Sequence, residues 1–287
     1  MRAASIPSAL EEAPGIRRLL TALALGFLAL FLLLPLGAVF VYALGEGPSH
    51  FAAAVLEPAA LSAFRLTLAS AAVAVAVNLV GGVAAAWLLA RFEFRGRSLL
   101  AALVDVPFSV SPIIVGLMLV LLFGSRGWFG PGLAERGVQV LFSFPGIALA
   151  TVFVTFPLVA REVLAVLQTG GAAEEEAALT LGASGWQTFL RVTLPRIKWG
   201  LFHGVVLSTA RAMGEFGAVS VVSGHIQGRT NTVPLHVEVL FNEYRTTAAF
   251  SVASILALLG LATLAARKLV EARGPSRGRR LAAARPT

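Results

Sequence analysis

Long stretches without charge constrain this chain more than any other feature of its sequence. Residues 19–44 carry no charged side chain and directly follow Arg17 and Arg18. About 18 to 20 apolar residues in a helix are enough to cross a bilayer, whereas the apolar core of a signal peptide has only about 7 to 15 residues. We therefore expect this run to be retained as a membrane span. Only 13% of the residues are charged, compared with roughly 25% in soluble domains.

Five further apolar stretches are long enough to cross a membrane. The expected transmembrane helices are 19–44, 65–91, 99–123, 138–160, 199–222 and 249–266. Each segment must satisfy its backbone hydrogen bonds internally in lipid, and none shows the alternation that is typical of barrel strands. The sequence therefore predicts an all-α integral membrane protein with six transmembrane helices.

Basic residues are divided unevenly between the two sides of this predicted bundle. With the amino terminus inside, the segments 1–18, 91–98, 161–198 and 267–287 carry 17 Arg and Lys residues, and the outer loops carry five. Cytoplasmic loops are enriched in Arg and Lys, so both termini are predicted to be cytoplasmic. The net charge of +8 is thus mainly a topology signal. Because the basic residues form no single stripe, we exclude nucleic acid as a partner.

The predicted inner loop at 161–198 contains local helix signals. Three glutamates at 174–176 suit the amino terminus of a helix, and Gly182 suits its end, so we expect a short helix over 173–181. Ser184 and Gln187 have the spacing of a capping box that opens a second helix. This pattern predicts a helix-turn-helix on the inner surface.

Proline and alanine positions refine this prediction. Pro195 cannot continue a helix in the ordinary way, so we expect the chain to turn there before it re-enters the membrane. The small residues Ala177 and Ala178 would let the first short helix lie close to a groove in another protein. A surface loop that packs under its own helices remains the alternative.

The order Glu176-Ala177-Ala178, three residues, Gly182, nine residues, Val192-Thr193-Leu194-Pro195 resembles the EAA loop of bacterial ATP-binding cassette importer permeases. Isoleucine is common in that family where this chain has Val192. The resemblance implies a type I ABC importer permease fold and a coupling helix that docks onto a cytoplasmic ATPase and transmits its closure. The coupling residues that it implies are Glu176, Ala177, Ala178, Leu181, Gly182, Leu194 and Pro195.

Two downstream runs, 211–226 and 228–244, resemble the sulfate/thiosulfate permeases of the CysW type. The core Gly214-Glu-Phe-Gly217 is shared with molybdate permeases, so a molybdate or tungstate permease remains an alternative. The resemblance implies a paired CysT-type permease subunit, two copies of a cytoplasmic ABC ATPase, a periplasmic sulfate/thiosulfate-binding protein and a bacterial inner membrane. The resemblance covers a permease domain at 60–270. Hydropathy and charge predict a cytoplasmic segment at 1–18, a first helix with its outer loop at 19–59 and a basic cytoplasmic tail at 271–287.

The energy source for transport is expected to lie outside this chain. A dianion entering a negative cytoplasm costs about 4.6 kcal/mol at 100 mV. The chain has no Gly-x-x-x-x-Gly-Lys-Ser/Thr phosphate loop, because its only lysines, Lys198 and Lys268, follow Ile and Arg. We expect no catalytic residue and no cofactor here, with ATP and Mg bound by the partner ATPase. His225 and His236 lack the spacing of a zinc site. An ion-gradient-driven secondary anion transporter is the alternative of another class, and it predicts inverted repeats that we do not find.

Ionisable residues and breakers inside the predicted spans are candidates for a gate or pore. Arg211 and Glu215 are four residues apart on the expected fifth helix, so they can pair as a packing element or as part of the anion path. In the third span, Asp105 is followed by Pro107 and Pro112, which favour a kinked or broken helix. Pore lining and a kink made for packing are both consistent with this pattern. The full candidate set is Arg211, Gly214, Glu215, Gly217, Asp105, Pro107 and Pro112.

Two further interpretations concern single elements. Asn78, in the second span, is expected to form an interhelical hydrogen bond. On the outside, Thr232 to Tyr244 is expected to form a short amphipathic helix that serves as an outer gate, contacts the binding protein or lies at the interface.

Overall fold

A computed structural model describes residues 14–273, and every regular element in that range is helical. The expectations for segments 1–18 and 271–287 fall mostly outside these residues. The elements are α1 (Pro14–Leu28), η1 (Ala29–Leu33), α2 (Leu34–Ala43), α3 (Pro48–Leu56), α4 (Pro58–Arg91), α5 (Arg97–Ser109), α6 (Pro112–Phe123), α7 (Gly130–Ala134), α8 (Phe144–Thr169), α9 (Ala173–Thr180), α10 (Gly185–Thr188), η2 (Phe189–Thr193), α11 (Leu194–Met213), α12 (Gly217–Val222), α13 (Val233–Asn242) and α14 (Thr246–Arg273). The two η elements are π-helical turns.

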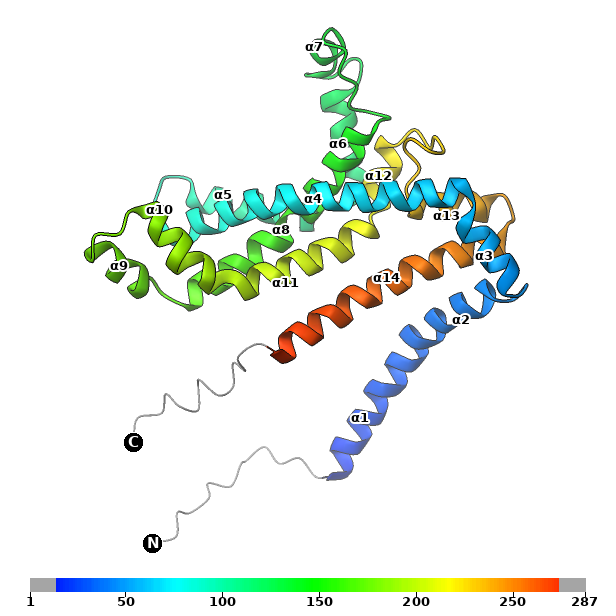
Figure 1. Cartoon of the computed structure of the whole chain (residues 1–287), viewed down its shortest axis with the longest axis horizontal. Helices are drawn as coiled ribbons and strands as arrows, with labels where there is room; N and C mark the ends of the chain where they lie inside the picture. Colours follow the sequence, from blue (N-terminus) through cyan, green and yellow to red (C-terminus); the bar gives the residue numbers. More distant parts are fainter. Residues whose placement is uncertain (1–13, 274–287) are drawn as a thin grey trace.

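Three long helices, α4, α8 and α11, pack lengthwise as the centre of the molecule (Figure 1). Small residues allow this close packing. A Cβ at Gly82 of α4 would lie 3.1 Å from the Ala160 nitrogen of α8, and one at Gly204 of α11 would lie 2.9 Å from the Val159 Cα. The interhelical hydrogen bond expected for Asn78 is confirmed, because its Nδ2 donates to Thr155 Oγ1 at 2.7 Å across the same α4–α8 contact.

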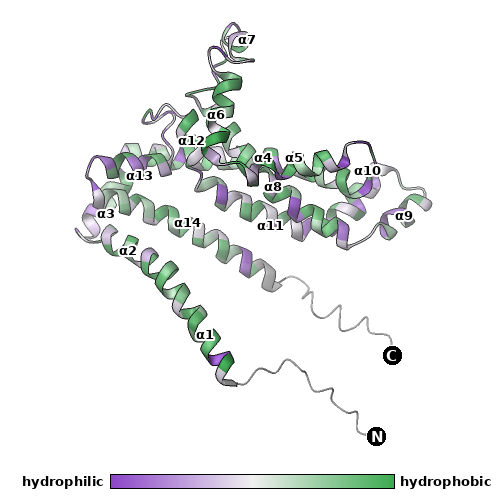
Figure 2. Cartoon of the chain, turned by 180° about the vertical axis from the view of Figure 1, so that it is seen from behind, coloured by the Kyte–Doolittle hydropathy of each residue, from purple (hydrophilic) through white to green (hydrophobic). Residues whose placement is uncertain are grey.

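Four helical stretches are long and apolar enough to cross a membrane: Gly15–Ala43, Pro58–Arg91, Phe144–Thr169 and Thr246–Leu269. Figure 2 shows that the first of them, built from α1, η1 and α2, is hydrophobic along most of its length. The most apolar part of this first stretch is fully exposed in the isolated chain. The expected helices at 19–44, 65–91 and 249–266 are therefore present.

The third expected span is broken, as its prolines predicted. Helices α5 and α6 pass the same length and composition test only as a pair, and they are bent by 112°. Ser111 has extended backbone angles because the ring of Pro112 disfavours the helical region for the residue before it. Pro107, by contrast, lies inside an uninterrupted α5.

Two predicted boundaries are wrong. The expected continuous helix 199–222 is split into α11 and α12 by residues 214–216. A new helix starts there because Glu215 Oε1 accepts a hydrogen bond from the Ala218 N–H, in the first turn of α12. The expected helix 138–160 begins instead at Phe144, with Pro145 in its first turn, and continues to Thr169.

Candidate functional site

The connector between α8 and α11 lies at one end of the bundle (Figure 1). The predicted short helix is confirmed as α9, with three glutamates in its first turn. Gly182 follows it with a φ of +88°, a conformation that glycine adopts at little cost. The capping box is also confirmed, because Ser184 Oγ accepts from the Gln187 N–H and the Gln187 side chain accepts from the Ser184 N–H.

The predicted turn at Pro195 is wrong. Helical backbone runs without interruption from α10 through η2 into α11, and Pro195 lies in the first turn of α11. The π-helical turn shifts the hydrogen-bond pattern just before the proline, so the missing N–H and the ring are accommodated without ending the helix. The last part of the connector, α10 and η2, is therefore joined rigidly to the long helix α11.

Helix α9 turns one acidic side chain inward and the others outward. The residue Glu175 is only 7% exposed. Its carboxylate forms an ion pair with Arg91, the last residue of α4, and accepts a hydrogen bond of 2.7 Å from Thr193 Oγ1 in η2. Its neighbours Glu174 and Glu176 are exposed.

The opposite side of the connector presents apolar side chains to solvent. Leu181 is 89% exposed, Trp186 69% and Leu179 51%. Of the predicted coupling residues, Glu176, Ala177, Leu181, Gly182 and Pro195 are exposed, Ala178 is half-buried, and Leu194 packs partly against the inner core of α4, α8 and α11. Exposed large apolar groups beside carboxylates suit a protein-docking surface.

The bent pair α5–α6 and the split pair α11–α12 meet where each is interrupted. A Cβ at Gly217, the first residue of α12, would lie 2.9 Å from Pro112 Cβ, the first residue of α6. One turn further on, a Cβ at Gly116 would lie 2.6 Å from Val221 Cβ. Helices α6 and α12 thus pack closely side by side, away from the long axis of the bundle (Figure 1).

Arg211 and Glu215 pair as predicted, although not on one helix. The Arg211 Nη1 lies 2.6 Å from Glu215 Oε2 across the end of α11. The carboxylate is almost fully buried at 1% side-chain exposure, while the arginine side chain is 40% exposed. The negative charge of Glu215 is therefore buried, and the positive charge of Arg211 lies at the surface of the subunit. Both residues are close in sequence to Gly214 and to the start of α12.

Asp105 is not part of that junction. It pairs with Arg161 of α8, with 2.6 Å between Oδ1 and Nε, and the Arg161 guanidinium lies 4.9 Å from the centre of the Phe108 ring. Both charged side chains are about half exposed. The structure thus places Arg211, Gly214, Glu215, Gly217 and Pro112 at the helix breaks, Asp105 in an ion pair between α5 and α8, and Pro107 inside α5.

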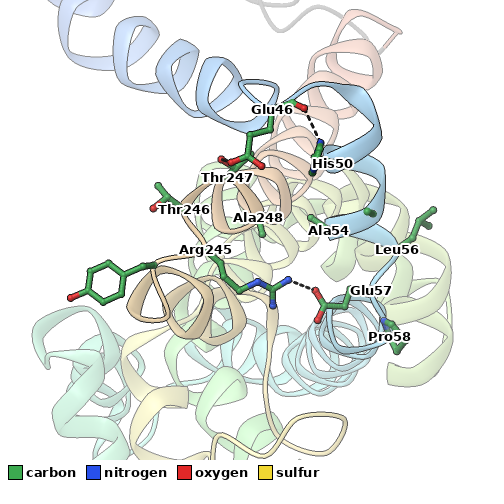
Figure 3. Close-up of a pocket in the computed structure, with 12 residues that line it drawn as sticks. Glu46, His50, Ala54, Leu56, Glu57, Pro58, Arg245, Thr246, Thr247 and Ala248 are labelled. Carbon is green, nitrogen blue, oxygen red and sulfur yellow. Dashed lines mark hydrogen bonds and ion pairs between the residues drawn. The ribbon is translucent and has the colours of Figure 1, made fainter.

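A cavity of about 890 Å³ opens at the other end of the bundle, between α3, the start of α4 and the α13–α14 junction (Figure 3). Glu57 accepts a hydrogen bond of 2.9 Å from Arg245 Nη2 at its wall, and Glu46 accepts one of 2.7 Å from Thr247. Tyr244 is 92% exposed beside it, with a φ of +61° that is strained for a tyrosine. The predicted short helix over Thr232–Tyr244 is present as α13, Val233–Asn242.

Three pKa shifts accompany this arrangement. The hydrogen bond from Arg245 lowers the pKa of Glu57, and the same contact raises the pKa of Arg245. Burial lowers the pKa of His236 on α13, which is 1% exposed. Within residues 14–273, no group of three or more His, Asp or Glu side chains is arranged to hold a metal ion.

Sequence reasoning missed the contacts of Arg91 and Glu175, and it missed the cavity beside Tyr244. Each depends on contacts between residues that are far apart in the chain, such as 91 with 175 and 57 with 245. One signal was available: Arg91 ends a long apolar span, where a charged side chain must reach a polar partner or water.

Comparisons with known proteins agree with this architecture. Residues 78–273 match the family described as binding-protein-dependent transport system inner membrane component. The sulfate transport system permease protein CysW of Synechocystis sp. is 52% identical over 90% of this chain and 94% of its own length. The corresponding CysT protein of Escherichia coli K12 is 39% identical over 83% and 86%. Among solved structures, a bacterial alginate ABC transporter in complex with a periplasmic protein superposes with a TM-score of 0.75 at 19% identity, over 90% of this chain and 96% of that one.

Proposed function

This chain belongs to the family of binding-protein-dependent transport system inner membrane components, as a CysW-type member, and from that premise we propose that it imports sulfate or thiosulfate. It is a multi-pass transmembrane permease subunit of an ATP-driven importer. An ion-gradient-driven carrier does not fit this family. The cargo proposal is supported by relatives that are named for sulfate transport. It is also supported by the partly exposed Arg211 side chain, whose positive charge suits an anionic cargo.

The proposed topology has six crossings with both termini in the cytoplasm of a bacterial cell, in the inner membrane. In this proposal the four long helical stretches and the bent pair α5–α6 each cross once. The split pair α11–α12, which does not pass the same length and composition test, is proposed as the fifth crossing. The excess of Arg and Lys on the α9 side supports this orientation. The cavity beside Tyr244 then faces outward.

The proposed complex contains this subunit, a CysT-type permease, two copies of a cytoplasmic ABC ATPase and a periplasmic sulfate/thiosulfate-binding protein in a lipid bilayer. ATP and Mg bind to the ATPase, and this chain supplies neither a catalytic residue nor a cofactor site. The pore lies between the two permeases, and its access alternates between the two sides of the membrane.

The exposed tip of the connector is the observation that carries the coupling proposal. Leu181 and Trp186 expose apolar surface next to Glu176 and Ala177, while α9 is bound to the bundle on its other side through Glu175. We propose that this tip seats in a groove of the ATPase. Closure of the ATPase pair then displaces α9, and with it the ends of the long helices.

Cross-linking tests this docking. The chain contains no cysteine, so a cysteine introduced at Ala177 is unique. In the assembled complex it is expected to cross-link to a cysteine in the ATPase, whereas Ala53→Cys at the outer cavity gives no such product. Absence of an ATPase adduct at Ala177 in complexes that assemble normally contradicts the proposal.

Uptake measurements test the cargo. Reconstituted complexes are expected to accumulate radiolabelled sulfate with ATP, and unlabelled thiosulfate is expected to compete more strongly than molybdate. Preferential inhibition by molybdate would instead assign the subunit to a molybdate or tungstate importer.

A further inference from the structure

The guanidinium of Arg91 joins three elements at the inner end of the bundle. Arg91 ends α4, and its side chain is 13% exposed. It forms an ion pair with Glu175 of α9, donates from Nη1 to the Leu167 carbonyl of α8 at 3.2 Å, and donates from Nη2 to the Gly171 carbonyl at 2.7 Å. One side chain thus connects α4, the last turns of α8 and the connector.

The carboxylate of Glu175 extends this cluster to a fourth element. While Oε2 contacts Arg91, Oε1 accepts the hydrogen bond from Thr193, which directly precedes α11. Both carboxylate oxygens of this buried side chain therefore have charged or polar partners. Such charge-assisted contacts are stronger than hydrogen bonds between neutral groups.

A second arginine holds the same joint from the other side. Arg196 of α11 donates to the Gly171 carbonyl at 3.3 Å and lies 3.7 Å from the Glu174 carboxylate. A Cβ at Gly170 would lie 2.0 Å from Arg196 Nη2, so the arginine side chain would have to shift if this residue were not glycine. The joint between α8 and α9 is thus enclosed by two guanidinium groups.

The backbone alone would leave α9 free to pivot. The helix is flanked by Gly171 and Gly182, with φ values of +65° and +88°. Glycine has the widest conformational freedom of any residue, so these two positions are natural hinges. A displacement applied to the exposed tip would rotate α9 about them unless side chains fix it to the bundle.

We propose that Arg91, acting through Glu175, is a positioning residue that makes α9 and the inner ends of α4, α8 and α11 move as one body. This inference rests on the proposed docking of α9 to the ATPase. Nucleotide-driven displacement of α9 reaches the helix ends because the buried ion pair removes the pivoting freedom that the flanking glycines provide. Without the pair, the ATPase would turn over while the bundle stays largely still.

The functional test measures sulfate taken up per ATP hydrolysed in proteoliposomes that contain the full complex. Arg91→Gln and Glu175→Gln are each expected to lower this ratio by about tenfold, within the range by which substitutions along a coupling path change coupling. The double variant is expected to be no worse than either single variant, because the two residues act as one unit. The matched control is Arg97→Gln, since Arg97 is exposed at the same end and donates only to the Leu89 carbonyl.

A distance measurement tests the same inference without any cargo. Spin labels at Ala173→Cys, an exposed α9 position outside the proposed docking residues, and at Lys198→Cys on α11 are expected to keep one distance with and without ATP in the parent complex. In Arg91→Gln, or in Arg91→Lys if the former does not assemble, the distance is expected to broaden and to change with ATP.

Three outcomes would overturn the inference: uptake per ATP within twofold of the parent in assembled variants, multiplicative losses in the double variant, or a label distance that already changes with ATP in the parent. Failure of the docking proposal is recognised separately. It would appear as a missing ATPase cross-link at Ala177→Cys in a complex that keeps Arg91 and Glu175.

Discussion

Replacing Gly116 by alanine tests the contact between α6 and α12. Gly116 lies in α6, and an added Cβ would be 2.6 Å from Val221 Cβ and 2.8 Å from the Ala218 carbonyl oxygen. Both contacts are shorter than carbon atoms tolerate, and one neighbour is backbone, which cannot rotate away. The substitution therefore forces α6 and α12 apart by several tenths of an ångström or more.

The magnitude follows from two opposing effects. Alanine inside a helix is favoured over glycine by about 1 kcal/mol, whereas overpacking a close contact costs about 1 to 3 kcal/mol. Gly260→Ala in α14 separates them, because no atom lies within 4 Å of its added Cβ. The helix preference is common to both variants, so their difference in unfolding free energy isolates the steric cost. We expect Gly116→Ala to be less stable than Gly260→Ala by about 1 to 3 kcal/mol.

The assay is unfolding of the purified complex by SDS in mixed micelles, followed by circular dichroism and paired with sulfate uptake. Gly116→Ala is expected to unfold at a lower SDS fraction and to transport more slowly, while Gly260→Ala keeps the parent rate. Equal unfolding midpoints together with full transport in both variants would refute the close contact of α6 with α12 as a structural and functional junction.

Three other substitutions give separate tests. Asn78→Leu removes the hydrogen bond to Thr155 and is expected to destabilise the complex by about 1 kcal/mol in the same SDS titration. Arg211→Gln leaves the buried Glu215 carboxylate without its ion pair and is expected to impair assembly of the complex. Adding Glu215→Gln to this variant is expected to restore assembly but not sulfate uptake. Full uptake by the double variant would assign the pair to packing alone. Arg245→Gln removes the contact that lowers the pKa of Glu57, whose stabilisation is present above its unfolded pKa and lost as pH falls through the folded pKa. Because both side chains are a third to a half exposed, parent and variant are expected to differ by at most about 1 kcal/mol at pH 7 and to converge in acid.

Local signals predicted local structure well in this chain. The glutamates at 174–176, Gly182 and the Ser184–Gln187 box defined α9 and α10 because each signal acts on backbone groups within one turn. The turn predicted at Pro195 was wrong because this signal, too, considers only one turn of backbone. A proline ends a helix only if the preceding turn keeps the α pattern, and the π-helical turn that accommodates it leaves no simple mark in the sequence.

Hydropathy predicted which segments are apolar but not how they bend. It located the third apolar segment correctly, and Pro112 predicted the break between α5 and α6. The fifth apolar segment gives no comparable signal for its break at 214–216. Nothing in its composition distinguishes Glu215 as a partner of Arg211 within one helix from Glu215 as the residue that starts α12. Residues four apart can pair in either case, so only the fold reveals that the ion pair observed at 2.6 Å crosses the end of α11.

The same fold determines how a small motion at the connector reaches the breaks. Helix α11 has 20 residues and is therefore about 30 Å long. It begins directly after Thr193, whose hydroxyl donates a hydrogen bond to Glu175. It ends at Met213, two residues before Glu215. A tilt of about 5° applied at the connector would move the far end by roughly 2.6 Å, because that displacement is the helix length multiplied by the angle. The contact of Gly217 with Pro112 leaves less room than that, so α12 cannot follow such a tilt unless α6 moves with it or the junction opens.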